Sequence, residues 1–178
     1  MTTQVTAHVY HLRHLVQEDR VLLAVDISPS QELAMLITRR LLRNLVTALA
    51  KMMTERAAPM GAMRDTILDF EHNSSVASAH AEGHIRDENR NAQDAKALAA
   101  PLRLVQEVKP VSKKDGGVSL VFDNREQMLT IEVAADRIHP VIETFLRIAE
   151  RAGWDFPPIT AWLEGPKDAI VPESRSIN

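Results

Sequence analysis

Two histidines, His80 and His84, have the spacing of a metal site, because side chains four residues apart lie on one face of a helix. The stretch between them reads HAEGH and differs from the zinc-protease pattern H-E-x-x-H, since its acid falls one residue later and off the face that a general base needs. A metal-binding protein or metalloenzyme using this pair is one hypothesis, and exposed surface histidines are the simpler interpretation. Further ligands stand nearby in the chain: Glu71, His72, Glu82, Asp87 and Glu88.

A second group of histidines, His8, His11 and His14, repeats every third residue near the N-terminus. The alternation of apolar and polar residues predicts a strand here, in which His8 and His14 lie about 20 Å apart on one face and His11 points to the other. We therefore expect no shared metal. Methionine thioethers suit copper(I), but methionine is more often a core filler or partner-facing residue, and we expect that role for four of them. These are Met52, Met53, Met60 and Met63.

Three arginines, Arg39, Arg40 and Arg43, form a basic patch on the polar side of a predicted long helix. They could contact phosphates or an acidic partner, and a solvated helix face explains them equally well. The chain has no glycine-rich phosphate loop and no G-x-S-x-G motif, and no spacing singles out a catalytic triad. The remaining kind of active site is one assembled in three dimensions from residues distant in the sequence. We expect a non-catalytic protein without a cofactor.

The long helix is predicted over residues 29–56, with Ser28 as N-cap, Pro29 in the first position and Gln31 closing a capping box. Its apolar stripe covers about half the circumference, which is wider than the usual core-facing stripe. The stripe contains Met35, Ile37, Leu41, Leu42, Leu45, Val46, Leu49, Met52 and Met53.

Surplus apolar surface on that helix predicts association with a second chain, and closed two-fold dimers are the commonest oligomers. We expect Met35, Val46 and Met53 to lie at or near the contact, because the opposite margin of the stripe suffices to cover a sheet. The main hypothesis is an interaction or assembly protein acting through helix 29–56, most simply as a homodimer. The alternatives are metal binding by His80 and His84, and nucleic-acid binding by the basic patch.

The remaining pattern predicts an α+β fold. An early hairpin, with a bulge or twist near Tyr10 and a central second strand at residues 21–27, precedes the long helix. Residues 102–134 form a three-stranded antiparallel meander with a turn at KKDGG, and Pro110 lies on its edge strand. A last helix over residues 136–152 starts at Asp136 and ends at Gly153. We expect one antiparallel or mixed sheet of about five strands, covered by two main amphipathic helices.

A single domain is expected over residues 1–165, followed by a flexible tail at 166–178. Residues 74–100 contain few large apolar side chains, so we expect a weakly ordered excursion there. Trp154 and Trp162 are expected to cover the end of the core.

Composition narrows the class of protein further. The chain has 178 residues, no cysteine and a net charge of −3, so it suits a reducing compartment and has no overall attraction for nucleic acid. With four Phe, two Trp and one Tyr, stacking platforms for single strands are hard to assemble. The N-terminal stretch lacks an export signal, and no apolar run reaches the about 20 residues of a membrane span. We expect a cytoplasmic protein.

Overall fold

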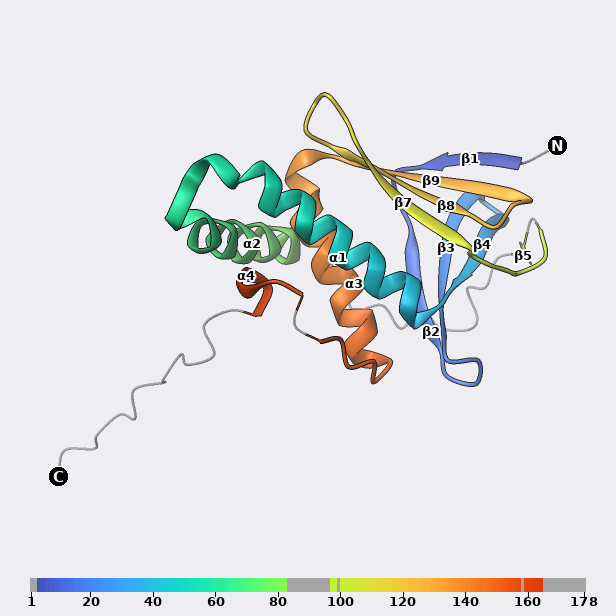
Figure 1. Cartoon of the computed structure of the whole chain (residues 1–178). Coiled ribbons are helices and arrows are strands. Elements are labelled where there is room, and N and C mark those ends of the chain that lie inside the picture. The colour runs from blue at the N-terminus through green and yellow to red at the C-terminus, as the bar shows by residue number, and fades with distance from the viewer. Residues whose placement is uncertain (1–2, 83–96, 99, 158, 165–178) are drawn as a thin grey trace.

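The computed structural model describes residues 3–82, 97–98, 100–157 and 159–164, and these form an α+β fold with two mixed sheets beside a group of helices (Figure 1). The single sheet expected from the sequence is therefore two sheets. The apolar face of each sheet must be covered, and the helices do this from one side.

The first sheet has the order β1-β9-β8-β7, and its last three strands form the predicted antiparallel meander. The meander starts later than predicted, because residues 103–104 pair with the other sheet. Lys113 donates its backbone N–H to the Gly117 carbonyl at 3.0 Å across the predicted turn, where Gly116 has a φ of +84°. Pro110 lies on β7, the edge strand, as expected for a residue that cannot donate a ladder hydrogen bond. The strands are β1 (Thr3–Ala7), β7 (Glu107–Ser112), β8 (Val118–Asp123) and β9 (Gln127–Val133).

The second sheet has the order β2-β3-β4-β5, with β6 also paired to β4. β3 is central, which confirms the expectation from its apolar residues on both faces. The predicted first strand is in fact two strands: β1 pairs in parallel with β9, whereas β2 forms the hairpin with β3. The change of apolar phase near Tyr10 marks this switch between sheets. The strands are β2 (His11–Leu15), β3 (Arg20–Ser28), β4 (Gln31–Ile37), β5 (Ala97–Leu98) and β6 (Arg103–Leu104).

The predicted helix over residues 29–56 was wrong in its first third. Residues 31–37 form β4, and α1 (Arg39–Arg56) begins after Thr38, whose hydroxyl accepts a hydrogen bond from the Leu41 N–H at 3.2 Å. Ser28 therefore caps no helix and lies at the end of β3. The physical reason is that QELAMLI contains good helix formers yet is apolar enough to be buried on both faces of a sheet, and tertiary packing overrides helix propensity.

Among the described residues the helical layer contains three long helices, where two were expected, and shorter turns. Asp136 lies in a 3-10 turn and is not the N-cap of the last helix, which starts later than predicted. Gly153 ends that helix with a φ of +66°, as predicted. The elements are η1 (Ala58–Met63), α2 (Arg64–Ala81), η3 (Ala135–Arg137), α3 (Ile138–Arg151) and α4 (Ala161–Glu164).

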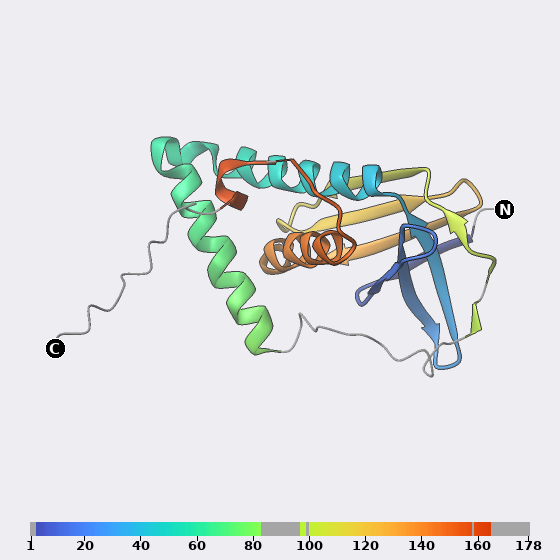
Figure 2. The same ribbon diagram turned by 90° about the horizontal axis from the view of Figure 1, so that it is seen from below.

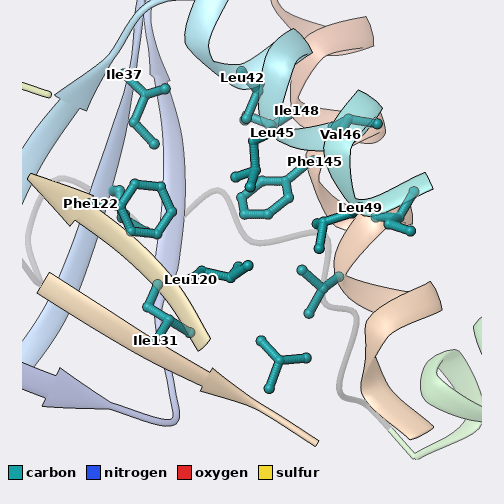
Figure 3. Close-up of a cluster of buried hydrophobic side chains, with 14 of the residues drawn as sticks. Ile37, Leu42, Leu45, Val46, Leu49, Leu120, Phe122, Ile131, Phe145 and Ile148 are labelled. Atoms are coloured by element: carbon teal, nitrogen blue, oxygen red, sulfur yellow. The ribbon is translucent and has the colours of Figure 1, made fainter. Parts of the chain in front are cut away.

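The main core lies between α1, α3 and the sheets (Figure 3). Leu45 and Leu49 of α1 are buried near Phe145 of α3, and β8 and β9 supply side chains such as Phe122 and Ile131 from the sheet. The predicted core face of α3 is confirmed by the burial of all its members. These are Ile138, Val141, Ile142, Phe145, Ile148 and Ala149.

Residues 74–81, expected to begin a weakly ordered excursion, belong to α2. Most of the rest of that excursion, residues 83–96 and 99, lies outside the described residues, as does the predicted tail. Trp154 and Trp162 are buried, as expected. None of the helices in the described part of the chain has the length and apolar content needed to cross a membrane.

Candidate functional site

The predicted metal pair is not brought together by the described residues. His80 is exposed in the last turn of α2, and His84 lies outside the described residues. Across the part of the chain that the structure describes, no three or more histidine, aspartate or glutamate side chains have the geometry of a metal site. The metal hypothesis therefore stays a prediction.

The N-terminal histidines are separated, as expected. His8 follows β1, while His11 and His14 lie on β2 and point to opposite faces of the sheet. His11 Nε2 lies 3.8 Å from an Asp26 oxygen, and His14 Nε2 lies 3.4 Å from an Asp19 oxygen. Each of these two histidines thus has its own carboxylate neighbour.

Two of the three predicted interface residues are in the core. Met35 and Val46 have no exposed surface, and Met53 is half-buried against the same core. The prediction assumed that Met35 stood on a helix margin without an intrachain neighbour, but it lies on β4, where its side chain faces the core between the sheets and the helices. The centre of the apolar face of α1 is consequently buried within one chain, and its margin at Met53 is half-buried.

The basic patch is at the surface. Arg39, Arg40 and Arg43 are all exposed on α1, and Arg39 donates a hydrogen bond to the Asp155 carbonyl. Of the four methionines considered for copper, Met52 and Met53 pack against the core, whereas Met60 and Met63 are 44% and 63% exposed. They therefore split into two core fillers and two surface residues.

A buried cluster that sequence reasoning missed lies where α2, α3 and α4 meet. His72 and His139 have ring centroids 5.5 Å apart, and Trp162 lies 5.6 Å from the first and 5.5 Å from the second, all edge to face. The Trp162 indole N–H donates to Thr54 Oγ1 at 3.1 Å, which ties the cluster to α1. These three rings therefore hold four helices together.

Carboxylates face both histidines of this cluster. His72 Nε2 lies 3.6 Å from Glu143 Oε2, and His139 Nε2 lies 4.0 Å from Glu71 Oε2. The contact with His72 and a hydrogen bond from Arg147, 2.7 Å long, lower the pKa of Glu143 to about 2 despite its desolvation. Burial, assisted by His72, lowers the pKa of His139 to about 4. At neutral pH the cluster thus contains an ionised Glu143 and a neutral His139.

The packing of this cluster should be sensitive to acid. Both ring nitrogens of His139, and Nδ1 of His72, are buried without a hydrogen-bond partner among the described residues. A proton added to His139 has no acceptor in hydrogen-bond contact, so protonation of His139 destabilises the folded state. His139 and Glu143 are four residues apart, a spacing that could have indicated a shared face, but nothing in the sequence shows that α2 packs against it.

An open cleft of about 510 Å³ runs along α3 beside this cluster. Glu143 and Arg147 line it from the helix, and Trp154 and Phe156 from the chain that follows. Glu143 and Arg147 are already paired with each other, so the cleft offers a ligand apolar surface and partly neutralised charge.

A different kind of surface lies on α2, which both views place at the end of the molecule away from the sheets (Figures 1 and 2). The inner side of α2 buries Leu68, His72 and Ala79. On the opposite side, Phe70 is 72% exposed and Met63, just before the helix, is 63% exposed. We define the α2 outer face as six residues spaced along one line of the helix: Met63, Ile67, Phe70, Ser74, Ala77 and Ala81.

Comparisons with protein-family models, with curated proteins and with solved structures found no match to this chain. Its function must therefore be inferred from the surfaces and clusters described above.

Proposed function

We propose that this chain is a non-catalytic interaction protein that binds a protein partner through the α2 outer face. The observation that carries the proposal is the exposure of Phe70, a large aromatic side chain that the fold does not use. Aromatic residues and methionine are enriched in protein interfaces, where burying them supplies much of the binding energy.

The position of Phe70 supports a binding surface rather than an isolated apolar residue. Met63 and Ile67 lie on the same side of the helix, seven and three residues before it, and Met60 of η1 is exposed close by. In the described part of the chain, the two most exposed large apolar side chains besides Phe70, Val9 and Val16, lie singly in turns between strands. Isolated apolar residues of that kind are normal on a protein surface.

The proposal moves the interface from the helix predicted by the sequence to its neighbour. It keeps the expected class of function, an assembly protein of the cytoplasm, for which the absence of cysteine gives support. The side chains at the centre of the apolar stripe of α1, such as Leu45, Val46 and Leu49, are buried within the chain, so they offer no surface to a partner.

Affinity purification from the source cells tests the proposal with three forms of the protein: wild type, Phe70→Glu and Val16→Glu. Val16 is 79% exposed, so its substitution is a matched control for adding a carboxylate at an apolar surface position. Proteins retained by the wild type and by Val16→Glu should be lost with Phe70→Glu, because an unpaired carboxylate is costly to bury at an interface. Equal retention by all three forms would refute the proposal.

Nucleic-acid binding is a second candidate, favoured by the exposure of Arg40 and Arg43 together with Lys51 on the same side of α1. Phosphate contacts make affinity fall steeply as salt is added. Binding of a short duplex should therefore weaken with salt and with Arg40→Ala plus Arg43→Ala, and salt-independent or undetectable binding would exclude this candidate.

A further inference from the structure

The α2 outer face has two halves of different size. Its N-terminal half has the large side chains Met63, Ile67 and Phe70, and its C-terminal half has the small ones Ser74, Ala77 and Ala81. At about 100° per residue, all six lie within about 40° of one line along the helix. The face is therefore a straight strip, bulky at one end and flat at the other.

Large and small residues are placed symmetrically about position 72. Met63 and Ala81 are equally far from it, and so are Ile67 and Ala77, and Phe70 and Ser74. If a second α2 lies antiparallel, with a two-fold axis at this level, each large side chain of one copy faces a small one of the other. A parallel pair would instead bring large against large at one end and leave a gap at the other, which costs packing energy.

We infer that the partner of the α2 outer face is a second copy of this chain, bound through an antiparallel pair of α2 helices centred on residue 72. This inference rests on the proposed function and names its partner. The match is isologous, as a closed two-fold dimer requires, because the same strip supplies both the large residues and their facing small ones.

Polar groups beside the face suit such a dimer. Asn73 donates its side-chain amide to Asp69 Oδ1 at 3.1 Å, so this pair is satisfied at the edge without a partner. The helix has 18 residues, which gives a contact about 27 Å long. A single helix pair of that length buries an area at the small end of the range for specific interfaces. We therefore expect a dissociation constant on the order of micromolar.

Cysteine cross-linking tests the register, and the chain has no cysteine of its own to interfere. In the inferred dimer Ile67 faces Ala77 of the other copy, whereas identical positions lie about 15 Å apart along the axis, beyond the about 7 Å between Cα atoms that a disulfide spans. A mixture of Ile67→Cys and Ala77→Cys chains should form a disulfide-linked dimer, and neither variant should form one alone. Disulfides in the unmixed Ile67→Cys sample would mean a parallel pair and overturn the inference.

Sedimentation analysis tests the dimer itself. The wild type and Val16→Glu should dimerise alike, and Phe70→Glu should weaken the dimer at least about tenfold. Ala77→Met is the sharper variant, because it adds apolar surface but places a large side chain against Ile67 of the other copy. It should also weaken the dimer about tenfold, since overpacking is destabilising. A tighter dimer would show unspecific apolar association and would overturn the inferred register.

The two proposals fail in different ways. A wild-type protein that stays monomeric at about 100 µM, well above the expected constant, would overturn the two-fold pairing. Loss of bound cellular proteins with Phe70→Glu would in that case still support a docking face for another protein. A dimer that Phe70→Glu leaves unchanged would place self-association on another surface, and equal capture of cellular proteins by all three forms would then refute the proposed function as well.

Discussion

Helices α1 and α2 have the same length, 18 residues, but use their apolar side chains in opposite ways. α1 packs against α3 and β7, and the centre of its wide apolar stripe is buried within the chain. α2 packs against α3, α4 and η1, and its inner side buries Leu68, His72 and Ala79, while the large aromatic side chain of Phe70 faces outward. The width of an apolar stripe therefore does not identify an interface, because the position of the helix in the fold decides how much of the stripe is covered.

The largest expected effect is at the centre of the buried stripe. Leu45→Ala should lower the free energy of unfolding by about 2–5 kcal/mol, because the truncated side chain loses its transfer energy and leaves a cavity near Phe145. Urea denaturation at equilibrium measures this. A loss below about 0.5 kcal/mol would mean that α1 is not the main support of the core.

Acid should lower the stability of the contact between the inner side of α2 and α3. The pKa of His139 is about 4 in the folded protein, below the usual histidine value of about 6.5, so folding favours its neutral form. The stability that depends on neutral His139 is therefore complete above about pH 6.5 and is lost as the pH falls toward about 4. The free energy of unfolding should fall by about 2 kcal/mol between about pH 7 and pH 5. Below about pH 4.5, protonation of Glu143, whose pKa is about 2, removes further stability.

Denaturation midpoints across this pH range check the acid effect, with His139→Phe as the comparison. Phenylalanine keeps an aromatic ring against Trp162 but cannot be protonated, so the slope between about pH 7 and pH 5 should flatten. An unchanged slope would assign the acid sensitivity to other groups.

A smaller effect is expected where α4 is tied to α1. Trp162→Phe keeps most of the ring contact with His72 and His139 but removes the hydrogen bond to Thr54 Oγ1. The free energy of unfolding should fall by about 1 kcal/mol, the typical net contribution of one hydrogen bond. Thr54→Val tests the same bond from its other end, and the double variant should lose little more than either single one.

The smallest effect is expected on the α2 outer face. Phe70→Ala should change the free energy of unfolding by less than about 0.5 kcal/mol at protein concentrations below the dimer constant, because this side chain packs little within the chain. Thermal denaturation of dilute protein measures it. A loss comparable to that of Leu45→Ala would show that Phe70 supports the fold, and the contrast between the two helices would disappear.

The sequence predicted correctly those helices and strands whose apolar residues recur at one regular spacing. The core face of α3 and the meander of β7, β8 and β9 could be predicted because their buried residues recur at helical or alternate spacing. Residues 31–37 could not, because a short run that is apolar on both faces fits a buried strand and a buried helix equally well.

The candidate sites were harder to predict for a different reason. The cluster of His72, His139 and Trp162 joins α2 to α3 and α4, which follow it more than 50 residues later, and no local spacing reveals such a meeting. The exposure of Phe70 likewise depends on which side of α2 faces α3. Sequence reasoning instead selected Met35, whose burial on β4 follows from the misplaced start of α1.

The parallel pairing of β1 with β9 has a consequence for synthesis on the ribosome. Strand β1 occupies the edge of a sheet whose remaining three strands, β7, β8 and β9, are made at least about 100 residues later, and Val5 and Ala7 pack on the core that those strands complete. β1 has no strand to pair with in this sheet until β9 has been synthesised, so the first sheet folds only after residues 127–133 have left the ribosome. A nascent chain stalled before residue 127 should therefore leave the residues of β1 open to proteases.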